Sequence, residues 1–123
     1  VYYFTRNAPV FRLYVPEEKD LHGDGGQRTL GAYHSGELAY VFNNLGIVGL
    51  GWNDTDHELS NTMADYWVNF ARNGNPNGPG LPNWPTYNSS SDIVQILGEE
   101  VKPAVHPRKV QLDRMENLFL KTR

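Results

Sequence analysis

The sequence of 123 residues contains no cysteine. Disulfide bonds and thiolate metal sites within the chain are therefore excluded. The absence does not fix the cellular compartment, because many secreted proteins also lack disulfides.

The sequence also lacks a long apolar run and a strong excess of one charge. No stretch approaches the roughly 20 apolar residues that a membrane-spanning helix needs. The formal net charge is -3, and lysine and arginine are scattered along the chain. We therefore expect no membrane span and no nucleic-acid partner.

The residues that are present favour a globular chain that is part of a larger fold. Hydrophobic residues make up 39% of the sequence and charged residues 20%, which is ordinary for a folded protein. The chain opens directly on an apolar run, Val1-Tyr2-Tyr3-Phe4, without a preceding turn. Because an unpaired strand edge promotes aggregation, we expect this strand to be a cut inside a larger sheet.

Apolar spacing and turn-forming residues divide the chain into segments. The expected segments are a strand at about 1–6, a second extended piece at about 10–15, a polar loop at about 17–29, a histidine-containing loop and helix at about 31–44, a helix at about 56–73, a proline- and glycine-rich loop at about 74–85, strands at about 93–106 and a helix at about 108–121. Two of these helices carry wide apolar faces, so we expect the chain not to be a complete domain on its own.

The helix at about 56–73 has the clearest pattern. Thr55 and Glu58 have the spacing of a capping box. Gly74 is a suitable residue to end the helix, and a proline follows soon after. One continuous apolar stripe runs between these ends, formed by Leu59, Met63, Tyr66, Trp67 and Phe70.

The four histidines are the first candidates for chemistry. His57 lies in an acidic first helical turn and is expected at the surface. His106 directly precedes the last helix and is expected to be structural. His22 lies two residues before Asp24 in the polar loop, and this pair is a very weak metal signature.

His34 differs from the others because small residues surround it. Gly31-Ala32 precede it and Ser35-Gly36 follow it, which places the imidazole where a loop meets a helix. A general base needs such a position, held by the backbone and open on one side. The same pattern also fits an ordinary buried histidine with Glu37 as a helix cap, and the residues alone leave both interpretations open.

No nucleophile accompanies His34. The sequence has no G-x-S-x-G motif, since no glycine stands two residues before Ser35, and it has no cysteine. The chain therefore does not contain a complete catalytic triad.

Two long segments resemble the type-B carboxylesterases and cholinesterases. Residues 31–42 read GAYHSGELAYVF, which is similar to the catalytic-histidine segment of that family. Residues 66–77 read YWVNFARNGNPN and residues 84–87 read WPTY, which are similar to a helix, a turn and a Trp-Pro step further along. Residues 1–4 look like the strand that leads toward the histidine loop. The resemblance covers nearly the whole chain in the right order.

The resemblance implies the C-terminal part of an α/β-hydrolase, a mostly parallel sheet flanked by helices. In that fold the triad runs serine, acid, histidine along the chain, so a C-terminal segment carries the histidine alone. It implies that His34 is the catalytic base of a serine carboxylesterase, and that Glu37 is a supporting acid beside the triad. Gly31, Ala32 and Tyr33 would line the pocket. It implies no metal and no organic cofactor.

The implied partners are a small ester substrate and an N-terminal portion of the same enzyme that carries the serine, the acid and the oxyanion hole. One alternative is a non-catalytic, cholinesterase-like adhesion domain, against which the presence of His34 argues. Another is an independent small binding domain, linked to a metal through His22 and Asp24, against which the apolar helix faces argue.

Overall fold

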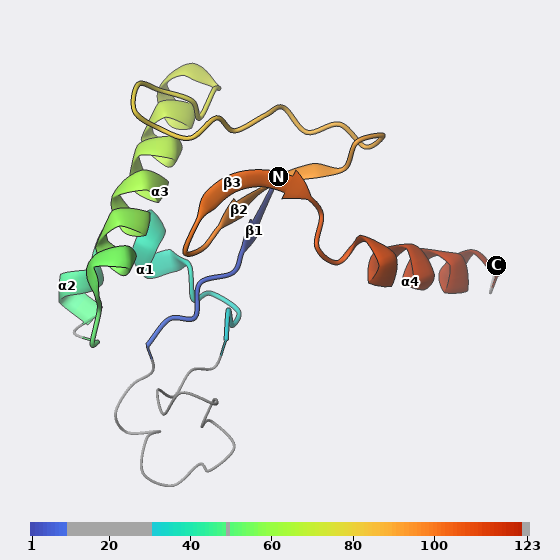
Figure 1. The fold of residues 1–123 in the computed structure, drawn as a ribbon, viewed down its shortest axis with the longest axis horizontal. Coiled ribbons are helices and arrows are strands. Elements are labelled where there is room, and N and C mark those ends of the chain that lie inside the picture. The colour runs from blue at the N-terminus through green and yellow to red at the C-terminus, as the bar shows by residue number, and fades with distance from the viewer. Residues whose placement is uncertain (10–30, 49, 122–123) are drawn as a thin grey trace, which may run out of the picture.

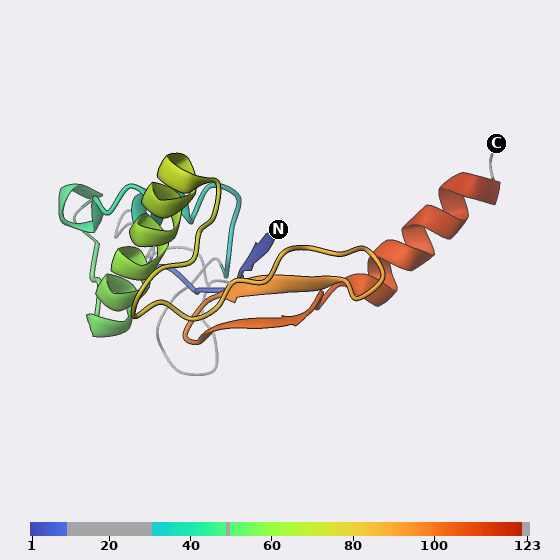
Figure 2. The same ribbon diagram turned by 90° about the horizontal axis from the view of Figure 1, so that it is seen from above.

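The computed structural model describes residues 1–9, 31–48 and 50–121. A small sheet lies beside the long helix α3, two short helices lie near α3, and the last helix projects away from the rest (Figures 1 and 2). In chain order the elements are β1 (Tyr2–Phe4), α1 (Leu38–Val41), α2 (Leu45–Val48), α3 (Asp54–Asn73), β2 (Ile93–Leu97), β3 (Val101–Val105) and α4 (Lys109–Lys121).

The described strands form one mixed sheet in the order β1-β2-β3. β1 pairs parallel to β2, with Tyr3 opposite Ile96, and β2 pairs antiparallel to β3. The strands expected at 93–106 are thus a hairpin. β1 is shorter than the expected strand at 1–6. The Thr5 N–H donates the last hydrogen bond between β1 and β2, to the Leu97 carbonyl at 2.8 Å, and the buried side chain of Arg6 then points toward α3.

The long helix α3 begins two residues earlier than expected and uses a different cap. Asn53, not Thr55, is the N-cap: its side chain accepts from the Asp56 N–H, and the Asp56 side chain accepts from the Asn53 N–H. A search restricted to the capping-box pattern S/T-x-x-E misses this cap, because asparagine and aspartate supply the same acceptors at the same spacing. Gly74 ends the helix as expected, with a φ of 68° that a side chain would strain.

The core lies between α3, α1 and the sheet. The apolar stripe of α3 buries Leu59, Met63 and Tyr66, whereas Trp67 is half-buried and Phe70 is exposed. Tyr40 of α1 packs its ring against Phe4 of β1, with ring centroids 5.3 Å apart. Elements far apart in the sequence therefore share one cluster of buried apolar residues, formed by Ala8, Tyr40, Leu45, Leu59, Met63, Tyr66 and Leu97.

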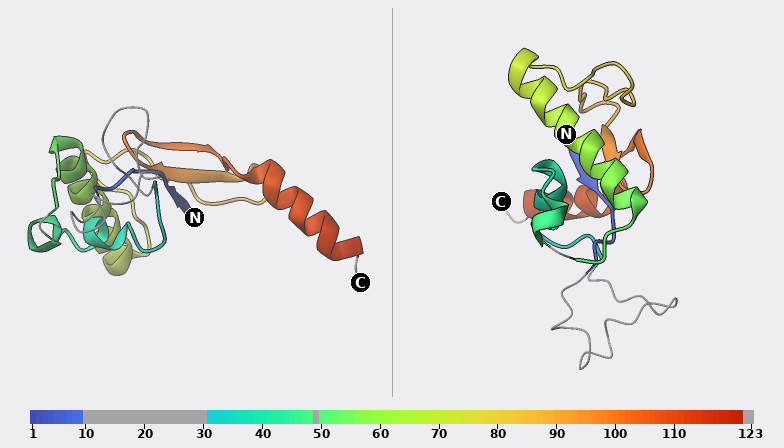
Figure 3. Two further views of the ribbon diagram at one scale, coloured as in Figure 1. Left: turned by 90° about the horizontal axis from the view of Figure 1, so that it is seen from below. Right: turned by 90° about the vertical axis from the view of Figure 1, so that its left-hand side faces the viewer.

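Helix α4 lies apart from this core, as the views from above and below show (Figures 2 and 3). None of its residues is buried. Val110, Leu112 and Met115 are each at least half exposed. Helix α2 was not expected, since its four residues are too few to show a period. The expected extended piece at 10–15 and polar loop at 17–29 lie outside the described residues.

Within the part of the chain that the structure describes, no helix combines the length and apolar character needed to cross a bilayer.

Candidate active site

His34 lies in a tight turn that leads directly into α1. The Gly36 N–H donates to the Tyr33 carbonyl at 3.0 Å, and the Leu38 N–H donates to the Ser35 carbonyl at 3.2 Å. Ser35 has a φ of 66°, a left-handed conformation that costs a non-glycine residue about 1–2 kcal/mol. The histidine side chain is exposed. The assignment of His34 as the catalytic base stays a prediction.

Glu37 occupies the N-cap position of α1 but does not act as a cap. Its side chain makes no capping hydrogen bond, although its carbonyl accepts from the Tyr40 N–H at 3.0 Å. The carboxylate instead faces Tyr2 of β1. Burial raises the pKa of the Tyr2 phenol, and the charge of Glu37 and a hydrogen bond to it raise that pKa further. The charge of Glu37, beside the turn that carries His34, therefore acts on a side chain of the strand β1.

The residues before His34 differ in their surroundings. Gly31 is half-buried with a φ of 67°, near the side chain of Asn7, and Ala32 is exposed. Tyr33 is half-buried and packs against the core. A Cβ at Gly36 would lie 3.0 Å from the Tyr33 carbonyl oxygen, so a larger residue there would require a small shift of the turn. The pocket-lining role of Gly31, Ala32 and Tyr33 stays a prediction.

A buried polar network holds α1 against α3. The Arg6 Nε lies 2.7 Å from Asp56 Oδ1, and the Tyr40 hydroxyl donates to the same oxygen at 2.8 Å. Arg6 also donates to Asn53 Oδ1 at 3.0 Å and to the exposed Glu99 at 3.1 Å. The side chains of Arg6 and Asp56 are only 9% and 2% exposed, so this is a desolvated ion pair.

The network shifts the pKa values of Asp56 and Tyr40 in opposite directions. Burial alone would raise the pKa of Asp56, but hydrogen bonds from Arg6, the Asn53 N–H and Tyr40 lower it below its ordinary value. Burial and the bond to Asp56 raise the pKa of Tyr40, so its hydroxyl is a donor. Sequence analysis did not find this network. The only signal in the sequence was an arginine directly after an apolar strand, which is also common at the surface.

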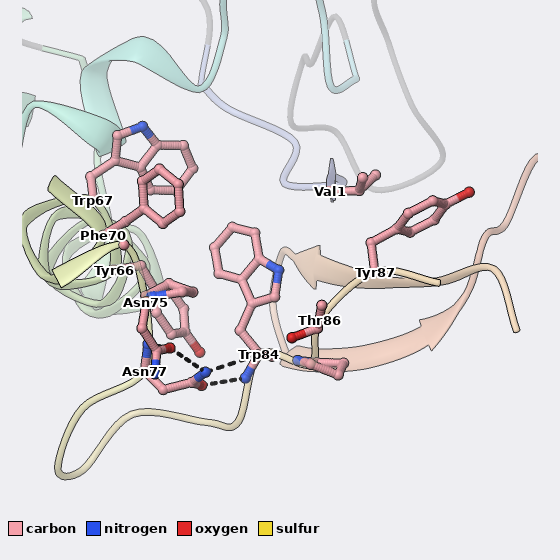
Figure 4. Close-up of a pocket in the computed structure, with 12 residues that line it drawn as sticks. Val1, Tyr66, Trp67, Phe70, Asn75, Asn77, Trp84, Thr86 and Tyr87 are labelled. Atoms are coloured by element: carbon pink, nitrogen blue, oxygen red, sulfur yellow. Dashed lines mark hydrogen bonds between the residues drawn. The ribbon is translucent and has the colours of Figure 1, made fainter. Parts of the chain in front are cut away.

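A groove of about 640 Å³ lies elsewhere, between the C-terminal half of α3 and the segment 74–87. Trp67 and Phe70 of α3 face Trp84 across it, and two hydrogen bonds join Asn77 to the Trp84 backbone (Figure 4). None of the residues expected around the catalytic histidine lines this groove. The groove is therefore separate from the candidate active site.

The other histidines have other surroundings. His57 is exposed in the first turn of α3. The His106 Nδ1 accepts from the Arg108 N–H at 3.1 Å, and its ring lies beside Tyr3. His22 is outside the described residues. Among the described residues, no group of three or more histidine, cysteine, aspartate or glutamate side chains could hold a metal ion.

The fold is that of known esterases. A thermophilic pNB esterase matches 89% of this chain with a TM-score of 0.66 and 27% sequence identity, and the match covers 20% of that structure. A carboxylesterase of Geobacillus stearothermophilus matches 91% of this chain with a TM-score of 0.66 and 26% identity, again over 20% of that structure. The chain therefore forms part of an α/β-hydrolase fold.

Curated relatives agree. A carboxylesterase 5A of Canis lupus familiaris is 33% identical over 82% of this chain and 19% of its own length. The cocaine esterase of Homo sapiens is 41% identical over 60% of this chain and 13% of its own length. A medium-chain fatty acyl-CoA hydrolase precursor of Anas platyrhynchos is 41% identical over 65% of this chain and 14% of its own length.

The model of the carboxylesterase family matches residues 1–115. The chain belongs to this family, as the type-B carboxylesterase and cholinesterase resemblance of the sequence predicted. It spans less than a fifth of the length of the curated relatives named above.

Proposed function

We propose that this chain supplies the catalytic base, His34, to a serine carboxylesterase that hydrolyses carboxylic esters through an acyl-enzyme. Membership of the carboxylesterase family supports ester hydrolysis. The observation that carries the residue assignment is the exposed position of His34 in a hydrogen-bonded turn that begins α1. An exposed imidazole held by its backbone can reach a substrate and exchange protons with it.

The proposed reaction uses residues that this chain does not contain. A serine from the N-terminal portion of the enzyme attacks the ester carbonyl while His34 takes its hydroxyl proton. As the tetrahedral intermediate collapses, the bond to the alcohol oxygen breaks and His34 returns the proton to that alcohol. In the second half, His34 takes a proton from water, which attacks the acyl-enzyme, and the proton passes back to the serine.

The remaining groups have supporting roles in this proposal. A carboxylate of the N-terminal portion holds the imidazole in the tautomer that accepts the proton. Glu37 fixes the turn through Tyr2, and Gly31, Ala32 and Tyr33 contribute to the wall of the pocket.

The test is substitution of each histidine in the complete enzyme. His34→Ala is expected to lower kcat for a simple aryl ester by about 10³-fold or more, because loss of a triad member removes general-base catalysis. His22→Ala, His57→Ala and His106→Ala are matched controls and are expected to stay within about tenfold of the parent enzyme.

Two outcomes would contradict the proposal. If His34→Ala retained parental turnover while another histidine variant lost it, the base would be in a different loop. If the complete protein hydrolysed no ester at all, the alternative of a non-catalytic binding domain of the same fold would replace the proposal.

A further inference from the structure

Tyr40 is attached to α3 at two points. Its side chain is fully buried, and its hydroxyl donates to Asp56 Oδ1 at 2.8 Å. Its carbonyl oxygen lies 3.0 Å from the buried Ser60 Oγ, one helical turn beyond Asp56. Asp56 is itself fixed by Arg6 and by the N-cap of the helix. Side chain and backbone of Tyr40 are thus both held by the N-terminal part of α3.

The same residue is joined to the turn that carries His34. The Tyr40 N–H donates to the Glu37 carbonyl at 3.0 Å. The bond from Leu38 to Ser35 continues this chain of hydrogen bonds back to the residue after His34. Because α1 is only four residues long, its hydrogen bonds alone cannot fix its orientation. Its direction depends on side chains that contact the rest of the fold, and Tyr40 is the residue of α1 that is buried.

The other end of the turn lies near the same network. Gly31 lies near the side chain of Asn7, and Asn7 directly follows Arg6, whose guanidinium binds Asp56. The start of segment 31–37 therefore lies beside a chain segment that Asp56 holds through Arg6. A shift of Tyr40 would act on the other end of this segment, through the hydrogen bond to the Glu37 carbonyl.

The position of a general base must be accurate to a fraction of an ångström. A misplacement of about 1 Å by a residue far from the chemistry can lower the rate by about 10²-fold. An exposed side chain is not held by core packing, so it depends on the backbone beneath it.

We propose that Tyr40 is a positioning residue: its hydroxyl bond to Asp56 orients α1 on α3 and thereby places His34 for proton transfer. This inference rests on the proposed function of His34. It assigns Tyr40 no contact with the substrate.

The test compares two buried tyrosines in the complete enzyme. Tyr40→Phe removes the hydroxyl bond to Asp56. Tyr66→Phe removes a hydroxyl that donates to the Pro82 carbonyl at 2.5 Å, from an equally buried position further along α3. Both variants keep the ring and are expected to lower the urea midpoint of unfolding, Tyr40→Phe by more, because its hydroxyl donates to a charged carboxylate.

Only Tyr40→Phe is expected to change catalysis. Measured well below the unfolding midpoint of every variant, its kcat for an aryl ester is expected to fall about tenfold while KM changes less than about twofold, because a displaced base slows the chemical step and leaves binding intact. A role in stability alone would move the midpoints and leave kcat unchanged in both variants. If Tyr40→Phe fails to fold, Ser60→Ala serves instead, because it removes the second attachment of Tyr40, and a smaller fall in kcat of about threefold is expected.

The outcomes separate this inference from the function on which it rests. If His34→Ala abolishes turnover and Tyr40→Phe, or Ser60→Ala in its place, has the same kcat as Tyr66→Phe, the positioning role of Tyr40 is wrong and the base assignment stands. If His34→Ala keeps parental turnover, the assignment of the base itself is wrong.

Discussion

The ion pair between Arg6 and Asp56 should be the most sensitive polar contact of the described fold. Arg6→Met keeps an unbranched apolar side chain of similar reach but leaves the Asp56 carboxylate without its cation. The Asp56 side chain is 2% exposed, so water cannot replace the lost partner. Removal of one partner from a buried pair costs about 3–5 kcal/mol. Because whole proteins are stable by only about 5–15 kcal/mol, this single change should bring the protein close to unfolding.

Two further variants allow the cost of Arg6→Met to be compared with smaller losses. Asp56→Asn keeps an oxygen that can accept from Tyr40, but it loses the charge and the second oxygen, which accepts from the Asn53 N–H. Because Arg6 keeps Glu99 as an anionic partner, we still expect a smaller cost of about 1–3 kcal/mol. Glu99→Gln is the matched control, because Glu99 binds the same guanidinium at 3.1 Å but its side chain is 82% exposed. An exposed partner of this kind contributes little that can be measured.

The assay is urea unfolding of the complete protein, followed by tryptophan fluorescence. We expect the order parent, Glu99→Gln, Asp56→Asn and Arg6→Met from the highest midpoint to the lowest, with the first two equal within error. Equal midpoints for Arg6→Met and Glu99→Gln would show that the pair is not desolvated in the complete protein, and the reasoning from burial would be refuted.

The remaining predictions concern acid stability, the core and the isolated chain. Since the pKa of Asp56 lies below its ordinary value of 3.8, its charge stabilises the fold above that pH, and this contribution is lost as the pH falls through the lower folded value. The urea midpoint of the parent should therefore fall at acidic pH, and that of Asp56→Asn should fall less steeply. Identical pH dependence of the two midpoints would contradict this prediction. Met63 is fully buried, so Met63→Ala should cost about 2–5 kcal/mol in the same assay, and a cost below about 1 kcal/mol would place it outside the core. The 123-residue chain alone should bind a hydrophobic dye, because Phe70, Val110 and Met115 are exposed, whereas sharp and dispersed amide resonances would show that it folds independently.

Local patterns in the sequence predicted the regular elements. The stripe from Leu59 to Phe70 and the glycine at position 74 predicted α3 to within two residues, because the 3.6-residue period and the C-terminal stop are encoded locally. Strands at about 93–106 were predicted from the apolar runs there, and the structure pairs them as the hairpin β2–β3. Helix α2 is too short to have a period, and β1 ends early because Arg6 finds a partner 50 residues away. No local pattern carries such a contact.

The candidate site was predicted from resemblance more than from physical pattern. Small residues around His34 indicated an open position, and the structure shows the side chain exposed. The pattern could not distinguish a capping glutamate from one that contacts a neighbouring strand, because Glu37 stands at the cap position in both cases. The network of Arg6, Tyr40 and Asp56 depends entirely on tertiary contacts, so it could not be predicted before the elements were placed together.

The most direct measurement for the central claim is the rate at which a fluorophosphonate probe labels the active serine of the complete enzyme. The probe reacts only with a serine that a nearby base activates, so the rate reports on the base without depending on the ester chosen. We expect His34→Ala to be labelled about 10³-fold more slowly than the parent, with His57→Ala and His106→Ala labelled at the parental rate. Labelling of His34→Ala at the parental rate would contradict the account, because the serine would then be activated by a residue other than His34.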